Sequence, residues 1–397
     1  MAPFERDMIE KYGEEDADEI VVNPKEISEA VTWGTDWTVE TIYNQLVKGN
    51  IALNPKFQRR NAWKIEKKSK LIESLILGLP VPEIILAENK EKRGSYIVID
   101  GKQRLLTIRH FLANVDDTNF KPFNLTKLKI LKELNGKNYR DIGQYPIFSQ
   151  HKTALDNQAI RTVIIKNWKN DDFLFSIFYR LNTGSEPLAP QELRQALHPG
   201  PFVDFIDEFA QNSHGIQKML RLSGEPDGRM RDTEMAIRYL AFKLLFERYD
   251  GNLKQFLDNC CLILNKSWAD NESEIRKSTN ELESAITMTY SIFGKNAFSK
   301  YQLKFSNKFN RAVFDIMVYY FSNPMVREKS EKKKELIKLK FIDLCKNDPD
   351  FLNSFGAGTK DIDKTIKRFG TWGSNLSKII NHPLVTPKIY DGKITIS

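Results

Sequence analysis

The chain has 397 residues, of which 41% are hydrophobic and 28% charged, and its formal net charge is +8. This composition is that of an ordinary globular protein with a sizeable core, and its basic balance favours polyanionic partners. No run of about 18 apolar residues occurs, so no membrane-spanning helix is expected. The cysteines, Cys260, Cys261 and Cys345, are too few for a disulfide framework, and we expect a cytoplasmic protein.

The first half of the chain alternates between helix-like and strand-like patterns. Residues 1–37 are predicted to be a flexible arm, after which Thr38 offers an N-cap. Apolar residues at helical or alternating spacing predict the elements that follow. Helices are predicted over residues 40–48, 65–77, 103–112, much of 123–155 and 173–182, with a further helix opening at Pro190; strands or extended segments are predicted over 51–53, 83–87, 95–99 and 159–165.

The second half differs, because almost every apolar pattern after Pro199-Gly200-Pro201 has helical spacing. Residues 388–396 could form a small terminal hairpin, and the lysine-rich stretch 327–346 is typical of a solvated helix face rather than of a DNA contact. The sequence therefore predicts an α+β protein: a mixed α/β domain over residues 38–200, followed by an all-helical domain over 201–397. The apolar helices of the second domain could pack internally or against another copy, as in a homo-oligomer.

The junction between a strand and a helix at residues 99–104 carries the clearest chemistry. An apolar β-like run ends at Asp100 and Gly101, and a helix follows at once with Lys102, Gln103 and Arg104 in its first turn. The free amides of a helix start favour phosphate, and lysine and arginine add positive charge. This pattern predicts a nucleotide or polyphosphate cradle that is not a P-loop, because the G-x-x-x-x-G-K-[ST] spacing is absent.

Asp100 has two interpretations in this turn. Its carboxylate could hold a metal ion attached to phosphate, or it could cap the helix by accepting a hydrogen bond from the amide of Gln103. Capping alone explains Asp100 but not the glycine and the basic residues that follow it, which favours the functional interpretation.

Two further polar segments are candidates for the same pocket. Gln58 and Arg59 lie in a basic and aromatic stretch, residues 54–63, whose arginines could hold phosphate. Asn182 and Thr183 follow a predicted helix end, and they could either line the pocket or belong to an ordinary helix–loop–helix connection.

Four motifs in this order resemble the N-terminal domain family of GmrSD-type modification-dependent restriction endonucleases. In that family an NP-x-FQR-x-x-x-W segment, a SRLIESILLGIPIP helix, an IDGQQRLTTI motif and an RINTG-x-x-L-x-x-QELR motif follow one another. The likeness extends from about residue 38 to about residue 245, because residues 229–242 also match. The motifs stand here at residues 54–63, 69–82, 99–108 and 180–194.

The resemblance implies a ParB/sulfiredoxin-like α/β fold that binds a nucleoside triphosphate with Mg²⁺. Carried over to this chain, it implies that Asp100, Gly101, Gln103 and Arg104 form the core of the site, with Gln58 and Arg59 across the pocket. We assign catalytic roles to Asp100, Gln103 and Arg104, and Asp100 is the candidate metal ligand. The nucleotide-binding candidates are Gln58, Arg59, Gly101, Lys102, Arg104, Thr107, Asn182 and Thr183.

Two departures from the family pattern bear on activity. Lys102 stands where the family usually has glutamine, which adds a phosphate-binding charge. The family often couples this domain to a His-Asn-His nuclease domain, and no such motif occurs in this sequence. The resemblance thus favours a partner that supplies the nuclease.

Three functional hypotheses follow. The first is a nucleotide-binding sensor or regulatory subunit of a bacterial DNA restriction or anti-phage system, which hydrolyses nucleoside triphosphate and whose helical half contacts DNA or a separate nuclease subunit. The second is a module that binds nucleotide or DNA without hydrolysis and docks such a nuclease. The third, a metal-dependent nuclease, relies on Asp100 alone among the acids of the motifs.

Overall fold

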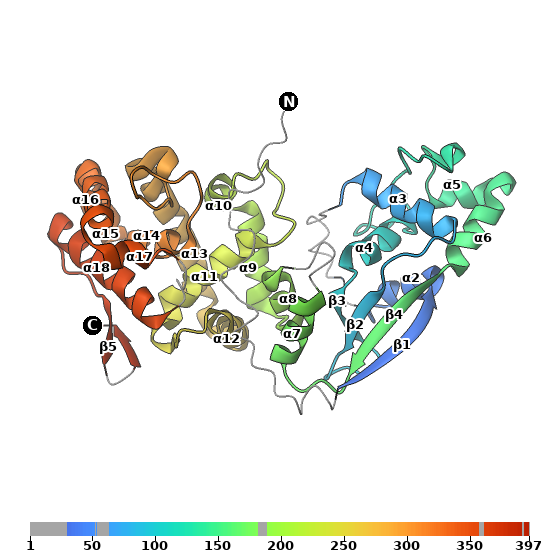
Figure 1. The fold of residues 1–397 in the computed structure, drawn as a ribbon, viewed down its shortest axis with the longest axis horizontal. Helices are drawn as coiled ribbons and strands as arrows, with labels where there is room; N and C mark the ends of the chain where they lie inside the picture. Colours follow the sequence, from blue (N-terminus) through green and yellow to red (C-terminus); the bar gives the residue numbers. More distant parts are fainter. Residues whose placement is uncertain are drawn as a thin grey trace. The chain divides into compact units, whose positions relative to one another are not determined.

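The computed structural model describes residues 30–51, 53, 63–181, 189–356, 361–390 and 393–396. Two compact units meet in the sequence between Leu197 and His198, close to the predicted boundary at residue 200, and each is described by itself. None of the helices in these ranges is long and apolar enough to cross a membrane. The first unit is mixed α/β and the second is mostly helical, in agreement with the fold class predicted from the sequence (Figure 1).

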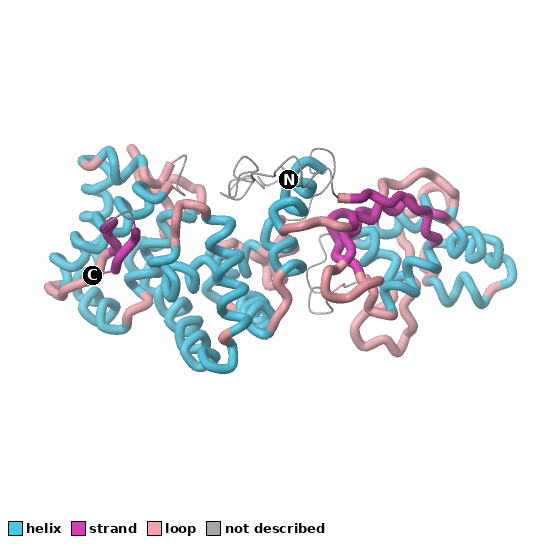
Figure 2. The backbone as a smooth tube through the Cα atoms, turned by 90° about the horizontal axis from the view of Figure 1, so that it is seen from below, coloured by secondary structure: helices cyan, strands magenta, loops and turns pink. Residues whose placement is uncertain are grey.

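The first unit is organised around a mixed sheet with the strand order β1-β4-β2-β3 (Figure 1). The central pair β2 and β4 is parallel, whereas β1 runs antiparallel to β4 and β3 antiparallel to β2. In the tube view these strands run side by side in one half of the chain (Figure 2). The strands are β1 (Val31–Thr38), β2 (Ile84–Glu88), β3 (Tyr96–Asp100) and β4 (Ala159–Lys166).

Helices precede, connect and follow these strands. Thr38 caps the first of them, since its side chain accepts a hydrogen bond from the amide of Thr41 at 3.1 Å. The helices are α2 (Val39–Val47), α3 (Ile65–Ile76), α4 (Lys102–Phe111), α5 (Tyr139–Gln144), α6 (Ser149–Asn157), α7 (Asp171–Leu181) and α8 (Pro190–Leu197), with 3-10 turns at Lys132–Leu134 and Pro146–Phe148.

Apolar side chains cover both faces of the sheet, as the alternation along β2 shows. Ile84 and Leu86 belong to one buried cluster, and Ile85 and Ala87 belong to the other. The first cluster includes side chains of α2, α3 and α4, and the second includes side chains of α7 and α8. The two clusters hold the start of α4 and the start of α8 close to the end of β3, where the predicted site lies.

The structure corrects three predictions in this unit. Residues 31–37, predicted as part of the flexible arm, form most of β1. Ile51 makes an isolated bridge with Tyr96 instead of a strand. The stretch 123–155, predicted to be mostly helical, contains only short helices, and its first nine residues form none.

Helices dominate the second unit. Hydrophobic side chains from most of them form one large buried cluster. The predicted C-terminal hairpin is present as the antiparallel pair β5 (Pro387–Tyr390) and β6 (Lys393–Ile396). The helices are α9 (Pro201–Asn212), α10 (His214–Met219), α11 (Arg231–Leu245), α12 (Leu253–Lys266), α13 (Trp268–Phe293), α14 (Arg311–Phe321), α15 (Pro324–Ser330), α16 (Lys334–Asn347), α17 (Pro349–Asn353) and α18 (Ile362–Ile380), with 3-10 turns at Phe246–Arg248, Gly294–Asn296 and Glu331–Lys333.

A buried ion pair joins three helices of this core. Arg238 of α11 donates from Nε and Nη2 to the two carboxylate oxygens of Asp315 in α14, at 2.5 and 2.6 Å. Arg368 of α18 places its Nη2 3.6 Å from the same carboxylate. All three side chains are almost completely buried, so each charge depends on the others for compensation.

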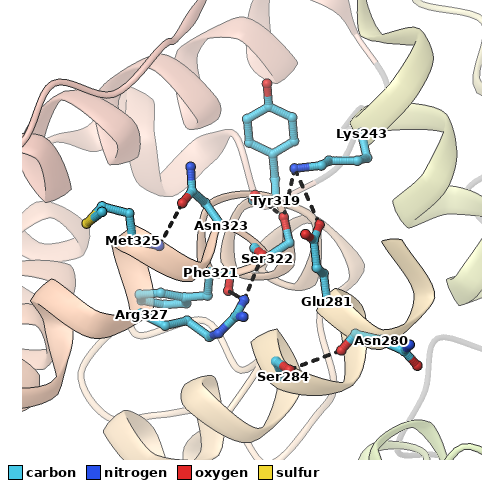
Figure 3. A network of polar contacts seen from close by, with 10 residues as sticks. All are labelled: Lys243, Asn280, Glu281, Ser284, Tyr319, Phe321, Ser322, Asn323, Met325 and Arg327. Atoms are coloured by element: carbon cyan, nitrogen blue, oxygen red, sulfur yellow. Dashed lines mark hydrogen bonds and ion pairs between the residues drawn. The ribbon is translucent and has the colours of Figure 1, made fainter. Parts of the chain in front are cut away.

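Polar contacts also connect α11, α13 and the end of α14, as Figure 3 shows. Lys243 lies 3.3 Å from the hydroxyl of Ser322 and 4.0 Å from a carboxylate oxygen of Glu281. Arg327 donates to the carbonyl oxygens of Phe321 and Ser322 at 2.8 and 2.6 Å, which satisfies acceptors at the end of α14.

The basic stretch 327–346 includes most of α16, and three of its lysines take part in local ion pairs. Lys334, Lys338 and Lys340 each lie within ion-pair distance of an acidic side chain three residues away. Ile337 and Phe341 are the buried apolar residues at the centre of α16. These pairs agree with the predicted solvated helix face.

Candidate functional site

Gly101 allows the chain to turn from β3 directly into α4. Its φ of +93° lies in the left-handed region, and its carbonyl accepts the first helical hydrogen bond, from the amide of Leu105. A Cβ at this position would lie 3.1 Å from Cγ1 of Ile84 and 3.3 Å from Nη2 of Arg104. The glycine is therefore required both by the backbone conformation and by the close approach of β2.

No side chain caps α4 among the residues that the structure describes. Gly101 is the N-cap residue, and the predicted alternative in which Asp100 accepts from the amide of Gln103 is not seen. The carboxylate of Asp100 instead accepts a hydrogen bond from Arg104, with Oδ2 3.0 Å from Nη2. The first turn of a ten-residue helix is thus left with amide groups that no side chain of the described chain caps.

Arg104 joins the start of α4 to two strands. Besides Asp100 at the end of β3, its Nη2 donates to the carbonyl oxygen of Glu83, just before β2, at 2.8 Å. The residue is only 6% exposed, and its Nε is buried without a hydrogen-bond partner in the described part of the chain. The arginine predicted to bind phosphate therefore also holds the turn in place.

Lys102 forms an ion pair that the sequence did not predict. Its Nζ lies 2.5 Å from Oε1 of Glu192 in α8, and the two side chains are 11% and 5% exposed. The other carboxylate oxygen of Glu192 accepts a hydrogen bond from the amide of Ala189 at 2.8 Å, next to the start of α8. The QELR motif at residues 191–194 contained a signal for Glu192, because it places this glutamate in the first turn of the helix that begins at Pro190.

Several buried side-chain amide atoms of α4 and α8 lack hydrogen-bond partners in the described part of the chain. Within the described ranges, Oε1 of Gln103, Nε2 of Gln191 and both polar atoms of Gln195 have none. Gln191 is fully buried and Gln195 is 4% exposed. Buried polar groups are usually paired, so unsatisfied ones beside a helix start are compatible with a polar ligand.

The remaining predicted residues are placed differently. Thr107 is fully buried one turn further along α4, and its hydroxyl donates to the carbonyl oxygen of Gln103 at 2.7 Å, which gives it a partner inside its own helix. The other candidates, Gln58, Arg59, Asn182 and Thr183, lie outside the described residues.

Two observations bear on metals and cavities. No group of three or more His, Cys, Asp and Glu side chains suited to a metal ion is found in the described ranges, and Asp100 is paired with Arg104. A cavity of about 620 Å³ lies at the opposite end of α4, where Phe111, Asp117 and Tyr139 are among its lining residues. This cavity does not include the residues of the predicted cradle.

Comparison with known proteins places the α/β unit in a family. No curated protein matches the chain. A family model described as the N-terminal domain of the GmrSD restriction endonuclease matches residues 39–199, a range that begins at α2 and ends just after α8. Residues 39–199 of this chain are therefore a GmrSD restriction endonuclease N-terminal domain.

Proposed function

We propose that the chain is the nucleotide-binding sensor or regulatory component of a DNA restriction system, and that it hydrolyses nucleoside triphosphate at the start of α4. The restriction context comes from the family of residues 39–199. The nucleotide site is inferred from the first turn of α4, which follows Gly101, has no side-chain cap in the described chain and begins with Lys102. A helix start of this kind offers aligned amide donors and a positive potential to phosphate oxygens.

Each residue of the turn has a proposed task. The first-turn amides of α4 hold phosphate oxygens, and Lys102 neutralises charge that develops on the transferred phosphoryl group. Arg104 fixes the turn through Glu83 and Asp100, so that the amides point to a constant position. Gln103, whose amide oxygen has no partner among the described residues, orients the attacking water. Mg²⁺, when bound, supplies positive charge to the phosphate oxygens, with Asp100 as its candidate protein ligand.

The test is calorimetric titration of the full chain with ATP, GTP, CTP and UTP in the presence of Mg²⁺. We expect at least one nucleotide to bind, and Lys102→Ala to weaken binding by about tenfold or more. Arg104→Ala should abolish binding, and its circular dichroism spectrum shows whether it still folds. Lys127→Ala, which removes an exposed lysine paired with Glu66, is the matched control and should bind normally. Absence of binding by every nucleotide would refute the proposal.

A second candidate function is binding without hydrolysis. It is favoured by the state of Asp100, because a carboxylate that is already paired with Arg104 is a poor general base. Release of inorganic phosphate, measured with and without DNA, separates the two functions. Release that stays at the level of the Arg104→Ala variant would favour the passive sensor.

A further inference from the structure

Both cationic side chains of the turn, Lys102 and Arg104, already form an ion pair with a carboxylate of the protein. Lys102 pairs with Glu192, and Arg104 pairs with Asp100. The charges of these four side chains sum to zero, although the motif at residues 100–104 alone suggests a basic cradle. A triphosphate that binds at the start of α4 therefore meets two carboxylates as well as two cations.

The two ion pairs differ in how they are held. Nη2 of Arg104 is shared between the carboxylate of Asp100 and the carbonyl oxygen of Glu83, so its guanidinium is fixed by two elements. Lys102 pairs with Glu192 from the end of a flexible four-carbon stem. Its ammonium group can therefore turn toward another anion while the backbone of the turn stays in place.

Glu192, in contrast, is fixed to its own helix. One of its oxygens accepts from the amide of Ala189, which satisfies a donor at the start of α8, while the other contacts Lys102. The glutamate therefore stays with α8 when Lys102 moves away. Its carboxylate is 5% exposed, so the loss of its counter-charge is costly.

We propose that Glu192 is an internal competitor of the phosphate ligand: it occupies Lys102 in the empty protein, and a bound triphosphate displaces it. This inference depends on the proposed nucleotide site at the start of α4. Exchange of the lysine from Glu192 to phosphate lowers the net affinity for nucleotide, because one ion pair is broken when another forms. The same exchange couples ligand binding to α8, whose last residue, Leu197, directly precedes the helical unit in the sequence.

The substitution Glu192→Gln tests the competition, because it removes the charge and keeps an oxygen that accepts from Ala189. We expect it to tighten the binding of tripolyphosphate and of the nucleotide that wild type binds by about tenfold. Glu66→Gln is the matched control, since Glu66 is the acidic partner of an exposed lysine, Lys127, in the same unit, and it should leave affinity unchanged. Unchanged or weaker binding by Glu192→Gln would overturn the proposal, and weaker binding would make Glu192 a residue that positions Lys102 for the ligand.

A double-variant cycle separates exchange from general repulsion. If Glu192 acts through Lys102, the gain from Glu192→Gln should fall below about threefold when position 102 is Gln. A gain that persists in the Lys102→Gln background would overturn the exchange. The outcomes also separate this inference from the proposed function: nucleotide that binds wild type and Glu192→Gln equally refutes only the competition, whereas nucleotide that binds neither refutes the site.

Discussion

Lys68 of α3 is a buried cation whose removal should stabilise the protein. The residue is 6% exposed, and its Nζ lies 5.8 Å from the centre of the Phe123 ring. No acidic side chain in the described part of the chain forms an ion pair with it. Burial therefore lowers the pKa of Lys68 from 10.5 to about 8.

The pKa gives the size and sign of the effect. A decrease from 10.5 to about 8 corresponds to about 3.4 kcal/mol, at about 1.36 kcal/mol per pKa unit. Below pH 8 the lysine is charged in both the folded and the unfolded chain, so this cost is fully present. Between pH 8 and 10.5 the folded protein releases the proton while the unfolded chain keeps it, and the free energy of unfolding rises with pH.

The substitution Lys68→Met removes the charge and keeps an unbranched side chain. We expect the free energy of unfolding of the α/β unit to increase by about 1–3 kcal/mol near neutral pH, and the increase with pH between 8 and 10.5 to disappear. Urea titrations of wild type and variant, at neutral pH and at the alkaline end of this range, measure both effects. Lys70→Met, at an exposed position of the same helix, is the control. A less stable Lys68→Met protein, or one that keeps the pH dependence of wild type, would refute the reasoning.

Three further substitutions test contacts elsewhere. Glu73→Ala removes a carboxylate oxygen that accepts from two backbone amides at 2.9 Å, and should lower the free energy of unfolding by about 2–4 kcal/mol in urea, whereas Glu73→Gln keeps an acceptor and should lose less. Asp315→Ala removes the carboxylate that pairs with the buried Arg238, and should lower the free energy of unfolding of the helical unit by about 3–5 kcal/mol. A double variant with Arg238→Met should recover part of this loss, because it also removes the buried positive charge. Gly101→Ala places a Cβ at a φ of +93° and 3.1 Å from Cγ1 of Ile84, so thermal unfolding should show a free energy of unfolding lower by about 1–3 kcal/mol. An unchanged melting temperature would contradict the required left-handed turn.

The sequence predicted correctly those elements whose capping residues and apolar spacing lie within the element itself. Thr38 and the apolar spacing behind it marked α2, and the apolar spacing of residues 65–77 marked α3. Residues 123–131 begin the stretch 123–155, which was predicted to be mostly helical, but they form no helix. Three of their amides are instead bonded to side chains of α3: Ser69 accepts from the amide of Thr126, and Glu73 accepts from the amides of Ile130 and Leu131. These partners are more than fifty residues away, and no local pattern contains them.

Strand β1 was missed for a related reason. It lies at the edge of the sheet, and among the described strands it pairs with β4 alone, more than a hundred residues later in the chain. Its side chains are mostly exposed, and Trp33 keeps 59% of its surface accessible. Val31, Trp33 and Trp37 do alternate with small or polar residues, but Gly34 and Asp36 are residue types that strands disfavour. The pairing with β4 that makes this segment an edge strand is not visible in its local sequence.

The candidate site shows the same division between local and distant signals. Gly101, Lys102 and Arg104 were found from the sequence because a strand end, a glycine and a helix start are adjacent in the chain. Their partners were not found, because the carbonyl of Glu83 and the carboxylate of Glu192 lie 21 and 90 residues away. These distant partners change the chemistry of the motif, since they turn a run of free positive charges into two compensated ion pairs.

This compensation determines which measurements are informative about the site. If free lysine and arginine bound the phosphates, affinity would depend mainly on the number of cations, and each charge removed would weaken binding. With both cations paired, affinity depends on the difference between two arrangements of Lys102, so removal of the acid at Glu192 strengthens binding. A gain in affinity from Glu192→Gln that disappears in the Lys102→Gln background therefore distinguishes a cradle that the protein's own carboxylate occupies until a nucleotide arrives from one that is open in the empty protein.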